Sequence, residues 1–381
     1  MFALTDAPTL RRVGMVSTYP PTRCGIARFA DRLVTGLTAL VPDVEIDVVR
    51  LIDGQGLPAI GKVRAEFDPD SPVGIRMAAR ILNRADGVIL QHEYGLFGDN
   101  DGEAVVDLVG SIHRPTVTIL HTVLADPSPR QRRIVQELHA ESSLVVLCGM
   151  AREALEEGYG IPAQEVSVVH HGSDWMPQPV NPAPRRRLIS WGLLGPGKGL
   201  ERGVRSIAEL QDLVPQPHYT IVGRTHPNVL RREGTAYRDS LQQLVSELDI
   251  GHLVTFIDRY VEEEELLTMV KDSDVVLVPY DNQEQMASGV VTDALAAGRP
   301  VVATRFPYAV EMLSDGSGIT VGHGASEVAS AIHGLFVDEA RYDAATGAAA
   351  RRSRTLAWTA CAKDIVELVH RTASKARLEV R

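Results

Sequence analysis

The chain has 381 residues, of which 44% are hydrophobic and 23% are charged. This composition is typical of a soluble globular protein and excludes a disordered chain, a collagen-like chain and a disulfide scaffold. At roughly 150 residues per domain the length predicts two domains. The formal net charge of -10 argues against a nucleic-acid-binding protein.

The cysteines and the two ends of the sequence predict a cellular location. Cys24, Cys148 and Cys361 lie far apart, without metal-ligand spacing, and residues 1–12 lack the apolar segment of a secretion signal. No run of about 18 apolar residues predicts a membrane span. We therefore expect a cytoplasmic chain with reduced thiols. Residues 341–381 are rich in arginine and lysine, which favours either a solvated helix face or peripheral contact with the inner membrane face.

Apolar runs typical of strands alternate with helical patterns along the first half of the chain. Residues 27–40 predict an amphipathic helix, because Phe29, Leu33 and Leu37 recur every fourth residue. Near-continuous apolar strands separated by helices indicate a parallel sheet covered on both faces. The predicted strands cover residues 13–17, 44–51, 87–90, 115–120, 143–147 and 166–169.

The pattern stops over residues 174–187, where closely spaced prolines indicate a semi-rigid linker, and then restarts. A last amphipathic helix begins at about residue 356. The chain is thus predicted to be α/β, with two doubly wound parallel-sheet domains in tandem. The second domain has predicted strands at 188–191, 219–222, 253–257, 274–278 and 300–303, and predicted helices at 200–213 and 231–248.

Ligands of open α/β sheets bind outside the carboxyl ends of the strands, so the segments that follow strands are the candidate sites. In residues 17–28 a strand ends, two prolines turn the chain, and Gly25 opens a helix. The free N–H groups and partial positive charge of a helix N-terminus suit a phosphate. The alternative is a plain turn.

A glycine-rich loop at residues 191–199 lies between a predicted strand and a predicted helix. It contains four glycines and Lys198, in a chain whose cations are mostly arginine. Backbone N–H groups can approach an anion closely there, and Lys198 supplies a point charge. The spacing matches neither the dinucleotide fingerprint nor the Walker A loop. The segment therefore predicts an anion site, with an ordinary loop as the alternative.

A third candidate segment, residues 279–300, combines a polar loop with a helix start. Glu284 and Gln285 lie in the loop, Ser288 and Gly289 open the helix, and Asp293 lies one turn inside it. Such a helix start can hold a diphosphate on its N–H groups, while the polar side chains bind a sugar or ribose. A simple N-cap role for Ser288 is the alternative, but it leaves the polar loop unexplained.

Taken in order, these segments resemble the retaining, nucleotide-sugar-dependent glycosyltransferases of family 4, which share the GT-B fold. The resemblance spans nearly the whole chain. It implies an acceptor-side Rossmann-like domain over residues 1–178, a donor domain over residues 179–355 and a C-terminal helix over residues 356–381 that crosses back to the first domain. It also implies that a hexose moves from a nucleoside-diphosphate sugar to a hydroxyl acceptor. The sequence has no cluster of acids with Mg²⁺ geometry, and its positive groups can take the role of a metal, so neither a metal ion nor a cofactor is expected.

The resemblance assigns roles by position. Lys198 resembles the lysine that binds the donor diphosphate, Gly25 a glycine of the loop facing it, and His121 the histidine beside the donor sugar. Residues 285–293 resemble the Glu-x7-Glu motif, whose acids contact the sugar and the ribose. The expected donor-binding residues are Gly25, Lys198, Arg224, Ser288, Gly289, Val290 and Asp293, and the expected catalytic residues are His121, Glu284 and Gln285.

This sequence departs from the family pattern at several positions. Gln285 and Asp293 replace the two glutamates, so either Glu284 or Gln285 is expected to contact the sugar. Leu193 stands where an arginine is common, and Arg224 is the candidate to supply that charge. These departures keep three alternatives open: a glycoside phosphorylase of the same fold, a sugar-nucleotide epimerase, and a non-catalytic nucleotide-sugar-binding protein.

The acceptor side is predicted from one segment only. His92, Glu93 and Tyr94 follow a strand of the first domain and offer hydrogen-bonding and stacking groups for a sugar. The alternative is a turn with Phe97 buried beneath it. The sequence leaves open the donor base, the sugar, the acceptor, the linkage and the oligomeric state.

Overall fold

A computed structural model describes residues 10–22, 24–52, 61–175 and 186–379 of the chain. Most of the predicted proline-rich linker, residues 176–185, lies outside the described residues. The chain forms two compact units. The first unit comprises Met1–Gly172 and Trp358–Arg381, and the second unit comprises Ser173–Ala357. The units therefore divide after Gly172, where the sequence-based division was placed after residue 178.

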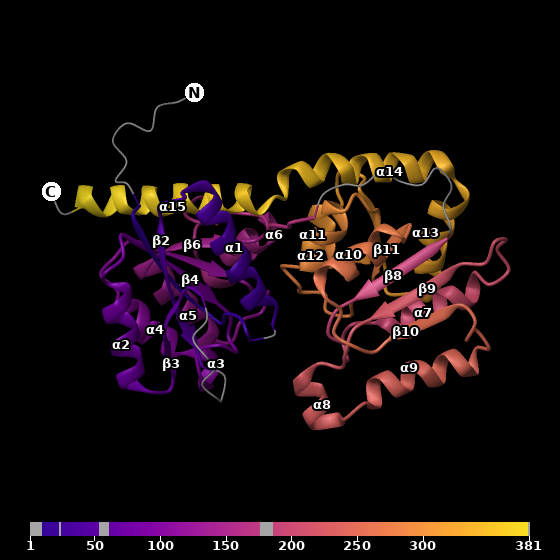
Figure 1. Ribbon diagram of the computed structural model, residues 1–381, viewed down its shortest axis with the longest axis horizontal. Coiled ribbons are helices and arrows are strands. Elements are labelled where there is room, and N and C mark those ends of the chain that lie inside the picture. The colour runs from indigo at the N-terminus through magenta and orange to yellow at the C-terminus, as the bar shows by residue number, and fades with distance from the viewer. Residues whose placement is uncertain (1–9, 23, 53–60, 176–185, 380–381) are drawn as a thin grey trace. The chain divides into compact units, whose positions relative to one another are not determined.

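The first unit is built on a seven-stranded parallel sheet with the order β3-β2-β1-β4-β5-β6-β7 (Figure 1). Its strands are β1 (Arg12–Ser17), β2 (Glu45–Leu51), β3 (Val63–Phe67), β4 (Gly87–His92), β5 (Thr116–Leu120), β6 (Ser143–Val146) and β7 (Ser167–Val168). Its helices are α1 (Gly25–Leu40), α2 (Pro72–Leu82), α3 (Asp99–Gly102), α4 (Ala104–Gly110), α5 (Pro129–Glu141), α6 (Gly149–Tyr159) and α15 (Trp358–Glu379).

Helix α1 forms as its sequence period predicts, with Phe29, Leu33 and Leu37 all buried. Helix α15 comes from the far end of the chain and packs along α1. Gly36 permits this close approach, since a Cβ atom there would lie 2.8 Å from the carbonyl oxygen of Trp358. The C-terminal helix is thereby part of the core of the first unit.

The second unit is built on a six-stranded parallel sheet with the order β10-β9-β8-β11-β12-β13. Its strands are β8 (Arg187–Trp191), β9 (His218–Val222), β10 (Val254–Ile257), β11 (Val275–Val278), β12 (Val301–Thr304) and β13 (Gly318–Val321). Its helices are α7 (Leu200–Glu209), α8 (Pro227–Glu233), α9 (Ala236–Glu247), α10 (Glu263–Lys271), α11 (Gly289–Ala296), α12 (Pro307–Met312), α13 (Ala325–Val337) and α14 (Glu339–Arg352).

The predicted fold class is confirmed, whereas two local predictions were wrong. The single helix expected over residues 231–248 is broken into α8 and α9 at Gly234, whose φ of 62° lies in the left-handed region. Strands β3 and β13 were not predicted from the sequence. Most of their side chains are exposed or only partly buried, so the continuous apolar signal of a central strand is missing.

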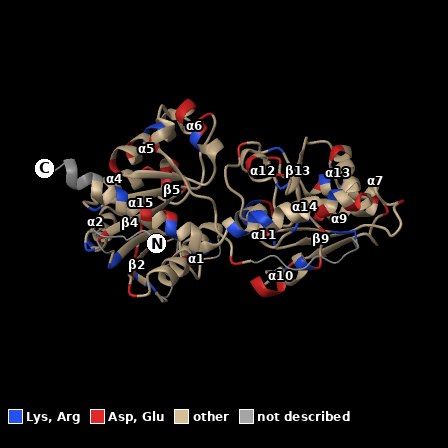
Figure 2. Ribbon diagram, turned by 90° about the horizontal axis from the view of Figure 1, so that it is seen from above, with Lys and Arg blue, Asp and Glu red and all other residues tan. Residues whose placement is uncertain are grey.

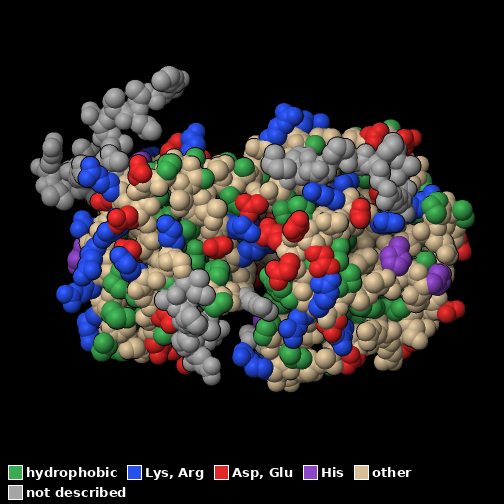
Figure 3. Space-filling view, viewed as in Figure 1, with side chains coloured by type: hydrophobic (Ala, Val, Ile, Leu, Met, Phe, Trp, Pro, Cys, Tyr) green, Lys and Arg blue, Asp and Glu red, His purple; other side chains and the backbone are tan. Residues whose placement is uncertain are grey.

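Charged side chains of both signs are scattered over each unit. Figure 2 shows an acidic start of α10, which begins with Glu263, Glu264 and Glu265, and Figure 3 shows acidic and basic side chains interspersed over one face. Within the described residues no helix is long and apolar enough to cross a membrane.

Candidate active site

The glycine-rich loop joins β8 to α7 at the carboxyl edge of the second unit's sheet. Gly192, Gly197 and Gly199 all have positive φ values, of 128°, 88° and 60°. Side chains at these positions would strain the backbone, so glycine is required for the path of the loop. The loop delivers Lys198 to the start of α7.

The ammonium of Lys198 lies against an aromatic ring. Its Nζ is 4.1 Å from the ring centroid of Tyr280, which follows β11 and stacks on Phe306. Among the described residues no carboxylate forms an ion pair with Lys198. A cation held by a π face, rather than by an acid, keeps its charge uncompensated for an incoming anion.

A small pocket opens beside Lys198. Trp191, Lys198, Tyr280 and Val290 are among the residues that line it. Val290 lies in the first turn of α11, so two segments predicted to bind the donor converge on one hollow. At that helix start the Oγ of Ser288 accepts a hydrogen bond from the N–H of Val291 (3.3 Å), as an N-cap does.

The structure gives Asp293 a partner that the sequence did not indicate. The hydroxyl of Ser173 donates to Oδ1 of Asp293 over 2.7 Å and accepts from the N–H of Trp175 over 3.2 Å. Asp293 is 2% exposed and Ser173 3%. The predicted contact of Asp293 with a ribose stays a prediction, and the carboxylate is buried and bonded inside the second unit.

Glu284 and Gln285, the alternative sugar-contacting residues, lie in different surroundings. The side chain of Gln285 turns back into its own loop and donates from Nε2 to the carbonyl of Ala287 (2.8 Å). Glu284 is exposed, and within the described structure its carboxylate has no hydrogen-bond or ion-pair partner. Of the two side chains, that of Glu284 is therefore the one that remains available to a ligand.

Arg224 lies in the segment that follows β9 and runs beside the glycine-rich loop. Its carbonyl accepts a hydrogen bond from the N–H of Leu194 over 2.8 Å, which ties the two segments together. The side chain of Arg224 is exposed and does not belong to the pocket lining. The backbone contact is thus the observed role of this residue.

In the first unit, Gly25 is exposed at the first position of α1, directly after β1 and its proline turn. The helix is capped by Cys24, whose Sγ accepts from the N–H of Ala27 over 3.3 Å. A cysteine cap was not anticipated from the sequence, because serine, threonine, aspartate and asparagine are the usual residues at that position. Nothing lies within 4 Å of a Cβ built on Gly25, so the helix start is open on that side.

His121 follows β5 and is oriented by two contacts. Its Nε2 lies 2.5 Å from Oε1 of Gln91, the fifth residue of β4. The ring also meets the edge of Phe29 at a centroid distance of 4.9 Å. Burial, with smaller effects from His171 and His92, lowers the pKa of His121 to about 3. The imidazole is therefore neutral at pH 7.

The three residues predicted to contact an acceptor are mostly buried. His92 is fully buried, and the hydroxyl of Tyr94 is engaged by the hydroxyl of Tyr159 at 3.0 Å. Glu93 is half-buried; it accepts from the hydroxyl of Thr122 over 2.6 Å, and burial raises its pKa. His92 and Tyr94 are thus core residues in this structure, and Phe97 is buried as the alternative interpretation predicted.

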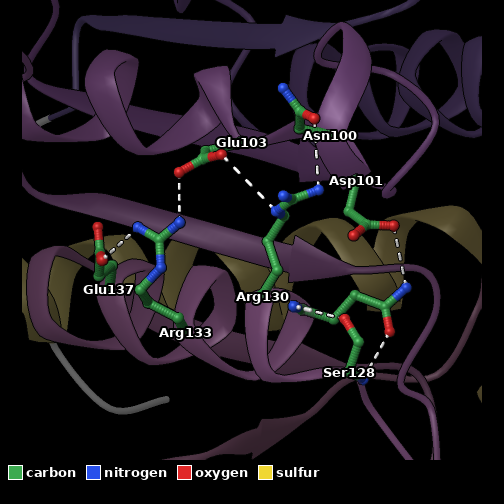
Figure 4. A network of polar contacts seen from close by, with 8 residues as sticks. Asn100, Asp101, Glu103, Ser128, Arg130, Arg133 and Glu137 are labelled. Carbon is green, nitrogen blue, oxygen red and sulfur yellow. Dashed lines mark hydrogen bonds and ion pairs between the residues drawn. The ribbon is translucent and has the colours of Figure 1, made fainter.

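The segment after β4 is held by the start of α5 (Figure 4). Asn100 and Asp101 both adopt left-handed backbone conformations, which ordinary residues avoid. Arg130 donates to Asn100 over 3.3 Å, and Gln131 donates to Asp101 over 3.1 Å. Glu103 completes the network through its ion pair with Arg133. These contacts hold the turn at Asn100 and Asp101 against the start of α5.

Among the described residues no three histidine, cysteine, aspartate or glutamate side chains are grouped to hold a metal ion. The site residues that sequence reasoning missed are Ser173, Tyr280 and Arg202. Arg202 lies in the first turn of α7, four residues after Lys198, and this short spacing in the sequence is the signal that could have connected it to the site.

Comparison with known proteins gives a family for the second unit. Residues 173–352 match the family of glycosyl transferases group 1. No curated protein matches the sequence. The resemblance to a glycosyltransferase that the motifs indicated is thus confirmed over residues 173–352.

Solved structures of the same fold cover nearly the whole chain. Anabaena Alr3699/HepE in complex with UDP and glucose is 16% identical, with a TM-score of 0.71, and the match covers 94% of this chain and 98% of that one. Sucrose-phosphate synthase from Thermosynechococcus elongatus is 16% identical, with a TM-score of 0.73 and coverage of 96% and 100%. α,α-Trehalose 6-phosphate synthase from Burkholderia multivorans is 14% identical, with a TM-score of 0.70 and coverage of 98% and 99%. At such identities these structures establish the GT-B fold.

Proposed function

We propose that this chain, which carries a glycosyl transferases group 1 domain over residues 173–352, transfers a hexose from a nucleoside-diphosphate sugar to a hydroxyl acceptor. One observation carries the proposal. The pocket of the second unit brings Lys198, which has no ion-pair partner among the described residues, together with the start of α11 at Val290. Both are positively polarised groups, and both suit a diphosphate.

In this proposal the pocket stabilises the leaving group. Negative charge grows on the departing diphosphate while the sugar becomes oxocarbenium-like. The ammonium of Lys198 and the free N–H groups of α11 are fixed in place before the reaction, so they stabilise that charge without reorganising. These groups supply the positive charge that a bound metal ion would otherwise provide, so we propose a metal-independent reaction. A further support is that the structural neighbour HepE is solved with UDP and glucose.

We propose that Glu284 contacts the transferred sugar. Its carboxylate is exposed and without a partner among the described residues, whereas the amide of Gln285 is bonded to Ala287. His121 is proposed to orient a sugar hydroxyl through its neutral imidazole, not to act as a general base. Retention then follows from same-face attack, in which the departing phosphate accepts the proton of the acceptor.

Donor binding is the first test. We expect one nucleoside diphosphate among UDP, GDP and ADP to raise the melting temperature in a thermal-shift screen, and its sugar to do the same. Lys198→Ala should weaken that binding in calorimetry by about 2–4 kcal/mol, because a charge-assisted contact is lost. Lys271→Ala, a lysine of α10 away from the pocket, is the matched control and should bind as the wild type does. Unchanged affinity in a folded Lys198→Ala protein would contradict the assignment.

The reaction itself is tested with the donor that the screen identifies. Release of nucleoside diphosphate that EDTA does not affect would support metal-independent transfer. A product whose anomeric carbon keeps the axial configuration of the donor sugar, as seen by NMR, would support retention. A strict requirement for inorganic phosphate would instead identify a phosphorylase. Donor binding with neither transfer nor slow hydrolysis would identify a binding protein.

A further inference from the structure

Arg202 makes three hydrogen bonds, which join two segments of the second unit that are distant in sequence. Its Nε donates to the carbonyl of His323 (2.6 Å), Nη1 to the carbonyl of Pro279 (2.7 Å) and Nη2 to Oδ1 of Asp281 (2.8 Å). The guanidinium is only 14% exposed. A planar group with a fixed fork of donors can hold three acceptors at once, which a lysine ammonium cannot do in the same geometry.

One of the two segments that Arg202 joins belongs to the pocket lining, through Pro279 and Tyr280. Pro279 and Asp281 flank Tyr280, whose ring lies under the ammonium of Lys198. The glycine-rich loop is bonded to the same segment, since the N–H of Asp281 donates to the carbonyl of Gly197 over 2.9 Å. Arg202 thus holds the residues on both sides of Tyr280.

The packing leaves little freedom around this contact. A Cβ atom at Gly199 would lie 1.9 Å from the carbonyl oxygen of Pro279 and 2.5 Å from Nη1 of Arg202. The glycine-rich loop therefore lies directly against the segment after β11. Without the guanidinium, two carbonyls and one carboxylate would lose their donor at this point of contact.

We propose that Arg202 is a positioning residue for the diphosphate site: it fixes residues 279–281, and with them Tyr280, so that the ammonium of Lys198 is held at the pocket. This inference rests on the proposed function for the identity of the ligand. The contact between Arg202 and the segment after β11 does not depend on that ligand, so it is tested separately.

The first experiment measures nucleotide affinity. Arg202→Met should raise the Kd of the nucleoside diphosphate selected by the screen by about tenfold, because Lys198 loses its fixed position while remaining charged. Arg202→Lys should restore only part of that affinity, since it keeps the charge and loses the fork. Arg205→Met is the matched control, because Arg205 is exposed on the same helix. A merely structural role would lower the melting temperature and leave the Kd of the folded protein unchanged, and that result would overturn the inference.

The second experiment needs no ligand. In Arg202→Met, hydrogen exchange of the backbone amides of Tyr280, Asp281 and the non-proline residues of the glycine-rich loop should accelerate relative to Arg205→Met. Asp281→Ala should accelerate exchange in the same segment, and the double variant should show less than the sum of the two effects. Unchanged exchange in Arg202→Met would overturn the clamping role. If the wild type binds no nucleotide but amide exchange is still faster in Arg202→Met, the proposed function is overturned and the clamping role is retained.

Discussion

At the scale of single residues, the buried pair of Asp293 and Ser173 shows that a side chain in a binding motif can also have a structural hydrogen bond. The position of Asp293 in the polar helix start favours a ribose contact. In the structure its carboxylate accepts from the Ser173 hydroxyl and is 2% exposed. A buried carboxylate with an internal donor contributes to the stability of the second unit.

Asp293→Ala is therefore expected to lower the free energy of unfolding by about 1–3 kcal/mol, because the Ser173 hydroxyl is left without its acceptor. It should weaken binding of a ribonucleotide and of its 2′,3′-dideoxy analogue by the same factor. Chemical denaturation and calorimetry measure the two effects, with Ser173→Ala as the companion variant. A loss of affinity confined to the ribonucleotide would show instead that Asp293 binds the ribose.

At the scale of secondary-structure elements, buried imidazoles lie at or just after the ends of three strands: His92 at the end of β4, His121 after β5 and His171 after β7. Burial lowers the pKa of His92 to about 4 and that of His171 to about 4, alongside His121. Neither ring nitrogen of His92 has a hydrogen-bond partner in the described structure. An unfolded histidine titrates near 6.5, so between about pH 4 and 6.5 the unfolded state binds more protons than the folded state.

The stability of the first unit should consequently fall as the pH is lowered from 6.5 towards 4. Each buried histidine contributes about 1–2 kcal/mol of that loss at pH 5. His92→Leu removes one of these titrations and should flatten the pH dependence of the unfolding free energy measured by urea denaturation. His113→Leu, at an exposed position, is the control. Equal slopes for wild type and His92→Leu would contradict the burial argument.

At the scale of the whole molecule, the chain returns to its first unit at the end. Trp358 opens α15 and meets the edge of Phe29 at a centroid distance of 4.9 Å. Further along the helix, the hydroxyls of Thr372 and Ser143 lie 2.8 Å apart. The first unit is thus incomplete until the last residues of the chain are present.

Trp358→Ala should destabilise the first unit by about 3–5 kcal/mol, because a large buried side chain is removed from its core. Hydrogen exchange followed by mass spectrometry should show lost protection in residues 10–172 and unchanged protection in residues 186–357. Lys363→Ala, an exposed position on the same helix, should leave both units protected. Equal loss of protection in both units would mean that α15 does not belong to the first unit alone.

The sequence by itself determined the class of fold and the segments of the site. Alternating apolar strands and amphipathic helices require two parallel sheets, because strands buried on both faces must be apolar throughout. The glycine-rich loop and the helix start at Ser288 were recognisable because glycine and capping residues act locally, within a few positions of the chain. For the same reason the buried face of α1 was predicted correctly.

Only the tertiary structure decided which side chains meet. No local pattern encodes contacts between residues that are distant in sequence. Such contacts are those of Tyr280 with Lys198, Ser173 with Asp293 and Arg202 with Pro279. The burial of His92 was equally hidden, since a histidine at a strand end is compatible with a site or with a core. Local chemistry fixes the backbone conformation and the spacing of apolar residues. The contact partners of a side chain depend instead on how strands and loops far apart in the chain are packed together.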